Sequence, residues 1–264
     1  LLPGDSMGVA LATGDLEAYA IGTVTYVDNQ RLLGFGHPLL WYGKVNLPIT
    51  ETWITTVMKG GAGLWPPYKL GFIGKTVGTL TDDRAAAVGG LLGQTPSMIP
   101  MTVAAKDLDR GTNLTLQLKL ATLKDYLRPL PAAAASESVL RAIDRLSQGT
   151  AWVTIQVETE ELGTIRRSDM LFDSWDVSFA PYYPMYQLMN ILLDNPYQAV
   201  TIKSIRVDSE VKEANQTAQL LEVDTSAFSG TVQQGKIIQV PVKVQPWRQP
   251  AETMTIPLQI PDDL

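Results

Sequence analysis

The chain has a single histidine, His37, within the apolar stretch LLGFGHPLL that runs from Leu32 to Leu40. Gly36 precedes the histidine and Pro38 follows it. A residue before a proline is pushed toward extended backbone, and a glycine lets the chain turn sharply. Such a turn can hold an imidazole at a fixed angle, as a general base requires. The bland alternative, a ring satisfied by a backbone carbonyl, is favoured by these residues alone.

A general base needs a nucleophile, and the chain has no cysteine, so serine or threonine remains. Three serines stand in turn-like segments: Ser6 in PGDSMG, Ser97 in GQTPSMIP and Ser229 in AFSGTV. None has the tight glycine elbow that exposes a catalytic hydroxyl. Each is more simply a turn or loop residue, although a hydrolase that uses Ser6 stays open as a third hypothesis.

A carboxylate that orients the imidazole would complete such a site. Asp82 and Asp83 follow the strand-like stretch VGTL and are the candidates for that role. The simpler interpretation is a turn with a local ion pair to Arg84. The catalytic candidates are therefore His37, Asp82 and Asp83.

The composition limits the other classes of function. The 264 residues carry a net charge of −6, with 45% hydrophobic and 18% charged residues, which indicates a globular protein. Without a basic run, nucleic acid is not expected as a partner, and the apolar runs are too short to span a membrane. With no cysteine, one histidine and no Asp-x-Asp-x-Asp loop, the sequence predicts no metal and no cofactor. The first residue is not methionine, so we expect that an upstream segment was removed.

The elements that must position these residues are mostly strands. Short apolar runs over 8–11, 18–27, 32–35, 45–48 and 53–58 predict strands, and Asp28-Asn29 predicts a hairpin turn. Strands at this spacing indicate an antiparallel barrel or sandwich over residues 1–105.

The rest of the chain divides into two further predicted parts. Residues 106–175 combine strands over 112–120 and 152–158 with a helix that begins at a Ser136 N-cap and stops at Gly149. Residues 176–264 begin with an apolar run of helical length over 186–193. Four strand-like segments of regular spacing follow, which predict a β-sandwich-like module. The fold class is therefore mainly β, with one or two helices.

Taken in order, five segments resemble a known family: PGDSMGVAL, GDLEAYAIGTVTYVD, RLLGFGHPL, VNLPIT and KLGFIGKTVGTLTDDRAAAVGGLLG. They are similar to the SpoIVB-type serine peptidases, in particular the broader bacterial members. The similarity covers Leu1 to about Pro100 and is loose beyond that point.

This resemblance implies a trypsin-like antiparallel β-barrel with a histidine and serine pair, acting on a protein or peptide outside the bacterial cytoplasm. His37 matches the family histidine, so the base role falls to it. The family serine lies in a Gly-Met-Ser-Gly-Ser-Pro motif, which this chain lacks. The expectation is a nucleophile upstream of Leu1, so that this chain by itself is inactive. The alternative is a peptidase-like binding or structural module of the cell envelope that lost its nucleophile.

Overall fold

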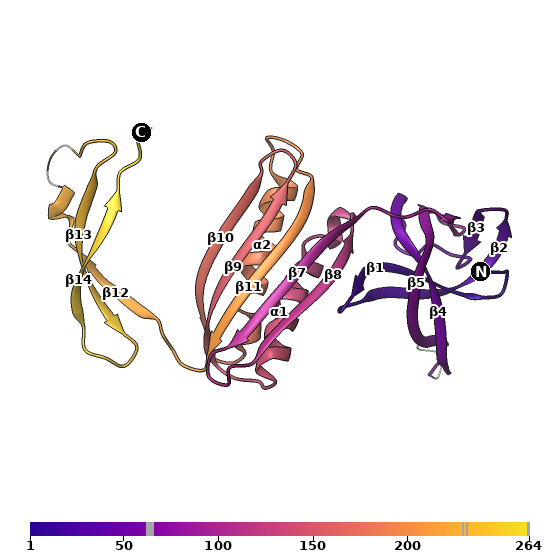
Figure 1. Cartoon of the computed structure of the whole chain (residues 1–264), viewed down its shortest axis with the longest axis horizontal. Helices are drawn as coiled ribbons and strands as arrows, with labels where there is room; N and C mark the ends of the chain where they lie inside the picture. The colour runs from indigo at the N-terminus through magenta and orange to yellow at the C-terminus, as the bar shows by residue number, and fades with distance from the viewer. Residues whose placement is uncertain (62–65, 229, 231, 263–264) are drawn as a thin grey trace.

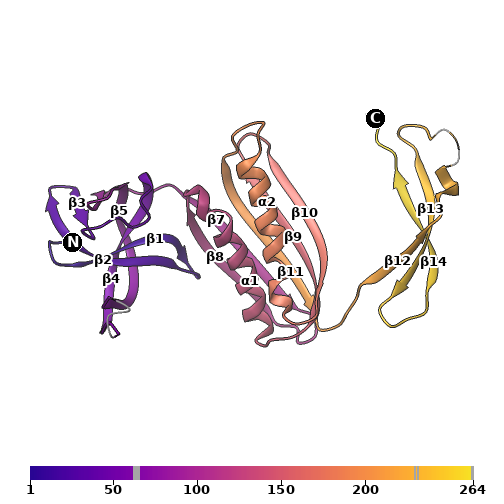
Figure 2. The same ribbon diagram turned by 180° about the vertical axis from the view of Figure 1, so that it is seen from behind.

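The computed structural model describes residues 1–61, 66–228, 230 and 232–262. The chain is mainly β and forms three consecutive parts, each with its own sheet or portion of a sheet (Figure 1). Figure 2 shows from behind that the two α-helices both cover the middle part. The described residues contain no helix that is long and apolar enough to cross a membrane.

The first part is an antiparallel barrel of six strands. Each strand pairs with the next in the order β1-β2-β3-β6-β5-β4, and a further pairing of β1 with β4 closes the ring. Their inward side chains, including Met7, Leu47 and Leu80, form one buried cluster. The bounds are β1 Ser6–Gly14, β2 Ala18–Asp28, β3 Arg31–Gly34, β4 Gly43–Met58, β5 Tyr68–Asp83 and β6 Val88–Leu92.

The predicted strands of this region are present, with one difference. The segments expected over 45–48 and 53–58 are one strand, β4, because its pairing with β5 continues through register shifts. The hairpin predicted at Asp28-Asn29 joins β2 and β3, and Asn29 takes the left-handed backbone that such a turn requires (φ 54°).

The ring closes at a point that requires glycine. Gly8 of β1 lies directly opposite Thr50 of β4. A Cβ atom on Gly8 would lie 2.3 Å from Thr50 Oγ1 and 2.8 Å from Ile73 Cγ2. Thr50 is completely buried, so the neighbours have little room to move. The absence of a side chain at Gly8 is therefore a condition for closing the barrel.

We expect Gly8→Ala to lower the free energy of unfolding by about 1–3 kcal/mol, because the new methyl group overpacks the closure. Urea unfolding followed by circular dichroism measures this change. Gly89→Ala in β6 is the matched control, since its Cβ would come no closer than 3.4 Å to another residue. Equal losses in the two variants would contradict the assignment.

The middle part is a five-stranded sheet with both helices on one face (Figures 1 and 2). The order is β10-β9-β11-β7-β8, and only the contact of β11 with β7 is parallel. The end of β1 pairs with β8, so β1 belongs to both the barrel and this sheet. The bounds are β7 Met98–Asp107, β8 Asn113–Ala121, β9 Gly149–Thr159, β10 Thr164–Asp173, β11 Ile202–Lys212, α1 Pro129–Ile143 and α2 Tyr182–Asp194.

The predicted ends of the first helix are wrong. Helix α1 begins at Pro129, where a proline costs nothing because the first helical N–H groups have no partner within the helix. Ser136 lies inside the helix, and its hydroxyl donates to the carbonyl of Ser178 at 2.8 Å. The helix ends with Asp144 in the left-handed conformation, and Gly149 begins β9 instead. The second predicted helix is present as α2.

The third part is a single three-stranded antiparallel sheet in the order β12-β13-β14. Four strands were predicted for this module, but the first of them is β11, which lies between β9 and β7 of the middle sheet. Its alternating buried residues, among them Ile205 and Val207, contribute to the core beneath the helices. The bounds are β12 Ala218–Val223, β13 Ile237–Pro246 and β14 Glu252–Gln259.

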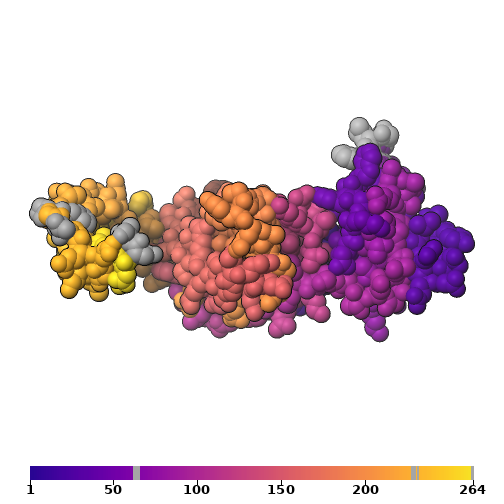
Figure 3. Space-filling view, turned by 90° about the horizontal axis from the view of Figure 1, so that it is seen from above, coloured from indigo at the N-terminus to yellow at the C-terminus, as the bar shows by residue number. Residues whose placement is uncertain are grey.

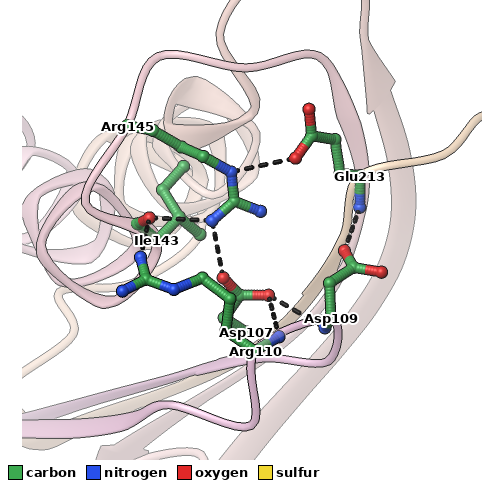
Figure 4. A network of polar contacts seen from close by, with 6 residues as sticks. All are labelled: Asp107, Asp109, Arg110, Ile143, Arg145 and Glu213. Atoms are coloured by element: carbon green, nitrogen blue, oxygen red, sulfur yellow. Dashed lines mark hydrogen bonds and ion pairs between the residues drawn. The ribbon is translucent and has the colours of Figure 1, made fainter.

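In the middle part, an ion-pair network joins the end of β7 to the segments that follow α1 and β11 (Figure 4). The fully buried Asp107, at the end of β7, binds Arg145 Nη1 at 2.7 Å and accepts from the backbone N–H groups of Asp109 and Arg110. Arg145 follows α1 and also binds Glu213, which follows β11. Burial by itself would raise the pKa of Asp107, but the hydrogen bonds from Arg145 and the two amides outweigh it and lower the pKa.

The pKa of Asp107 is lower in the folded chain than in the unfolded chain. The network therefore stabilises the fold at pH values above the pKa that this aspartate has in the unfolded chain, about 4. That contribution is lost as the pH falls through the folded pKa. We expect Asp107→Asn to lower the free energy of unfolding by about 1.5–3 kcal/mol at neutral pH. The difference from wild type should shrink below about pH 4. Chemical denaturation at several pH values measures it, and a pH-independent difference would contradict this account.

Candidate functional site

His37 lies in the connection from β3 to β4, on a backbone with unusual angles. Phe35 and Gly36 are both left-handed, with φ of 67° and 74°. Glycine adopts this region freely, but for a bulky residue such as Phe35 it is a true outlier that surrounding contacts must hold. The Phe35 ring supplies one such contact, because it covers Gly22 of β2 so closely that a Cβ there would lie 2.4 Å from the ring.

The imidazole of His37 is exposed and has two contacts. Its Nδ1 lies 2.7 Å from the carbonyl oxygen of Pro38, and its ring meets the Phe35 ring edge-on with centroids 5.6 Å apart. A carbonyl oxygen can only accept a hydrogen bond, so Nδ1 carries the proton and Nε2 of the neutral ring keeps its lone pair. The arrangement leaves one basic nitrogen available at the surface of the barrel.

Asp83 holds the segment that follows His37. Its carboxylate is fully buried at the end of β5 and accepts from the backbone N–H groups of Leu39 and Leu40, both at 2.8 Å, and of Tyr42 at 3.3 Å. Asp82 and Asp83 were the two candidates for a carboxylate that orients the imidazole. Among the described residues, no hydrogen bond joins the Asp83 carboxylate to the ring, and the carboxylate contacts the loop through main-chain amides instead.

Asp82 points into a different environment from Asp83. Its partly exposed carboxylate forms ion pairs with Lys44 at 2.8 Å and Arg84 at 3.2 Å, and accepts from the Thr81 hydroxyl. The hydrogen bond from Lys44 is the largest cause that lowers the pKa of Asp82, and Thr81 and Arg84 add to it. Asp82 thus forms the local ion pair that was the simpler interpretation, and in the described structure it does not bind His37.

Two aromatic residues complete the loop. Tyr42 donates its hydroxyl to Asp125 Oδ2 at 2.6 Å, and this bond raises the pKa of Tyr42 to about 12, so the phenol stays protonated near neutral pH. The bond ties the loop to the segment before α1. Trp41 is 71% exposed and has a left-handed backbone (φ 62°). The loop therefore displays a large aromatic side chain beside a backbone that Asp83 and Tyr42 fix.

The candidate serines lie apart from this arrangement. Ser6, at the start of β1, accepts a hydrogen bond from Lys69 Nζ at 3.0 Å, and the same ammonium also binds Thr23 Oγ1 at 2.7 Å. Ser97 is exposed directly before β7. Ser229 lies outside the described residues. In the described part of the chain, no serine or threonine hydroxyl is hydrogen-bonded to His37.

Two parts of the site were not predicted from the sequence. A backbone carbonyl as partner of the His37 ring was the simpler alternative, and the contact of Nδ1 with the Pro38 carbonyl agrees with it, but which carbonyl it is carries no sequence signal, because every residue has one. The role of Asp83 depends on the pairing of β4 with β5, which sets Asp83 opposite Gly43 and brings its carboxylate beside the loop. An aspartate at a strand end, with a loop before the partner strand, is the only hint that the sequence offers.

No protein-family model, no curated protein and no solved structure matches the chain.

Asp83→Ala should lower the free energy of unfolding by about 2–4 kcal/mol, because three backbone N–H groups lose a charged acceptor in a buried place. Asp82→Ala, one residue away, should cost less than about 1 kcal/mol, since its ion pairs are solvent-exposed. Denaturant unfolding of both variants tests the contrast. Comparable losses would show that Asp83 does not hold the loop.

Proposed function

We propose that this chain is the histidine-bearing portion of a SpoIVB-like serine endopeptidase. His37 is the general base, and the nucleophile is a serine of the segment upstream of Leu1 in the full-length protein. The substrate is a protein or peptide, and the protein acts outside the cytoplasm, in the bacterial envelope or as a secreted enzyme. One observation carries the proposal: an exposed imidazole with Nδ1 engaged and Nε2 free, on a strained loop that a buried carboxylate secures.

The geometry of the His37 ring is compatible with the chemistry of a general base. Nε2 takes the proton of the attacking hydroxyl, and the imidazolium that forms keeps its Nδ1–H donated to the Pro38 carbonyl. The carbonyl dipole selects the correct tautomer, the task that a carboxylate performs in a serine triad. Because the ring is already oriented before substrate arrives, no reorganisation is needed at the moment of proton transfer.

The closed six-stranded antiparallel barrel also supports the proposal, since the resemblance to the peptidase family implies a barrel of this kind. The strained Phe35 adds to it. Left-handed backbone at a bulky residue costs free energy, and such strain gathers at functional sites.

The second candidate is a peptidase-like module that binds without catalysis. One observation favours it: none of the described serine and threonine hydroxyls is hydrogen-bonded to His37. In that case the exposed Trp41 and the loop around it serve as a contact surface. The residues upstream of Leu1 in the gene distinguish the two, because only the enzyme needs a glycine-flanked serine there.

A fluorophosphonate probe on the full-length protein tests the enzyme. We expect labelling of an upstream serine, and a fall in labelling rate of at least about 100-fold in His37→Ala, because the general base is lost. Asp82→Ala is the matched control and should label normally. The 264-residue chain by itself should remain unlabelled. Labelling of the full-length protein that is unaffected by His37→Ala would rule out the base role.

A further inference from the structure

The C-terminal three-stranded sheet has one face made of apolar side chains. Along β13, alternate residues point to opposite faces, and the partners directly across the ladder share each face. One face, the more polar one, carries Gln239, Lys243, Thr253 and Thr255, together with Ile237, Pro241 and Pro257. The other, the apolar face, has at its centre Leu220, Val240, Val242, Met254, Ile256 and Leu258.

This apolar face is partly exposed in the described structure. Its central side chains on β13 are buried, but those on the flanking strands stay open to solvent, from 43% exposed at Ile256 to 57% at Leu220. A sheet of three strands with one apolar face normally packs against a second layer, because burial of that face supplies most of its stability. Exposed apolar side chains gathered on one face of a sheet mark an interaction surface.

The two ends of the apolar face carry opposite charges. At one end, Glu252 lies directly across from Val244. At the other end, the ladder continues for one more pair, since Ile260 N donates to Lys236 O at 2.9 Å. By alternation Lys236 then falls on the same face as Ile238. Among the described residues between these ends, no charged side chain lies on the face.

We propose that this apolar face is a self-association surface, occupied by the same face of a second copy of the chain. Two such sheets stack face to face and complete a two-layer sandwich of the kind that antiparallel sheets form. The twofold axis lies in the plane between the two sheets and runs perpendicular to the strands. It places the Lys236 end of one copy over the Glu252 end of the other. The apolar centres then meet, and both charged ends are complementary.

The pattern also argues against a charged or polar partner. Such a partner would find no matching group between the two ends of the face. A second copy needs none, because it offers an equally uncharged centre. The inference stands on the C-terminal sheet alone and does not depend on the proposed peptidase function.

Sedimentation velocity of the full 264-residue chain at increasing concentration tests the proposal. Wild type should sediment as a dimer that dissociates on dilution. Ile256→Lys places a charge in the centre of the face and should raise the dissociation constant at least about tenfold. Thr255→Lys, the adjacent residue on the polar face, is the matched control and should dimerise as wild type does. A wild type that remains monomeric, or equal behaviour of the two lysine variants, would overturn the proposal.

A charge exchange tests the predicted orientation and does not rely on the core substitution. Lys236→Glu and Glu252→Lys should each weaken the dimer by about two- to fivefold, as expected for exposed ion pairs. The double variant should recover most of the affinity, because the charges again oppose each other across the twofold axis. A double variant no tighter than the single variants would exclude the antiparallel stacking.

Discussion

The contact between Gly8 and Thr50 is the constraint on which the rest of the barrel depends. It joins the first strand to the fourth and turns an open sheet into a ring. Closure removes the free edges and fixes the relative tilt of all six strands. The connection from β3 to β4 that carries His37 is therefore anchored at both ends by strands whose positions are already determined.

Within this frame, the candidate site is built from the backbone more than from side chains. The Pro38 carbonyl holds the imidazole, and three main-chain amides hold the Asp83 carboxylate. Side-chain chemistry is concentrated in two places: the free nitrogen of His37 and the buried charge of Asp83. The proposed reacting group and the group that holds the loop are therefore different residues. Asp83 can be fully buried while His37 stays accessible to solvent.

The sequence predicted the periodic features well, since alternation and apolar runs report directly on strands and on α2. The sequence was a poorer guide to the start of α1 and to the sheet that β11 joins, because these depend on contacts between residues far apart in the chain. The alanine-rich start of α1 has few large apolar residues to reveal a helical stripe, so the helix was expected to begin near Ser136 instead of Pro129. The segment that became β11 has an ordinary strand pattern, and nothing local tells which sheet it joins. His37 was predicted as a candidate, whereas its partners arise only from long-range contacts.

The place of β11 in the middle sheet affects the order in which that sheet is assembled on the ribosome. β11 separates the β7-β8 pair from the β9-β10 pair, yet it is the last of the five strands in the chain. At ordinary rates of synthesis, β7 waits on the order of 100 residues, or roughly 5–20 s, for its parallel neighbour. During that interval two hairpins with unpaired inner edges emerge in succession. The nascent chain thus has a defined window in which a chaperone, or a wrong strand, can occupy the gap.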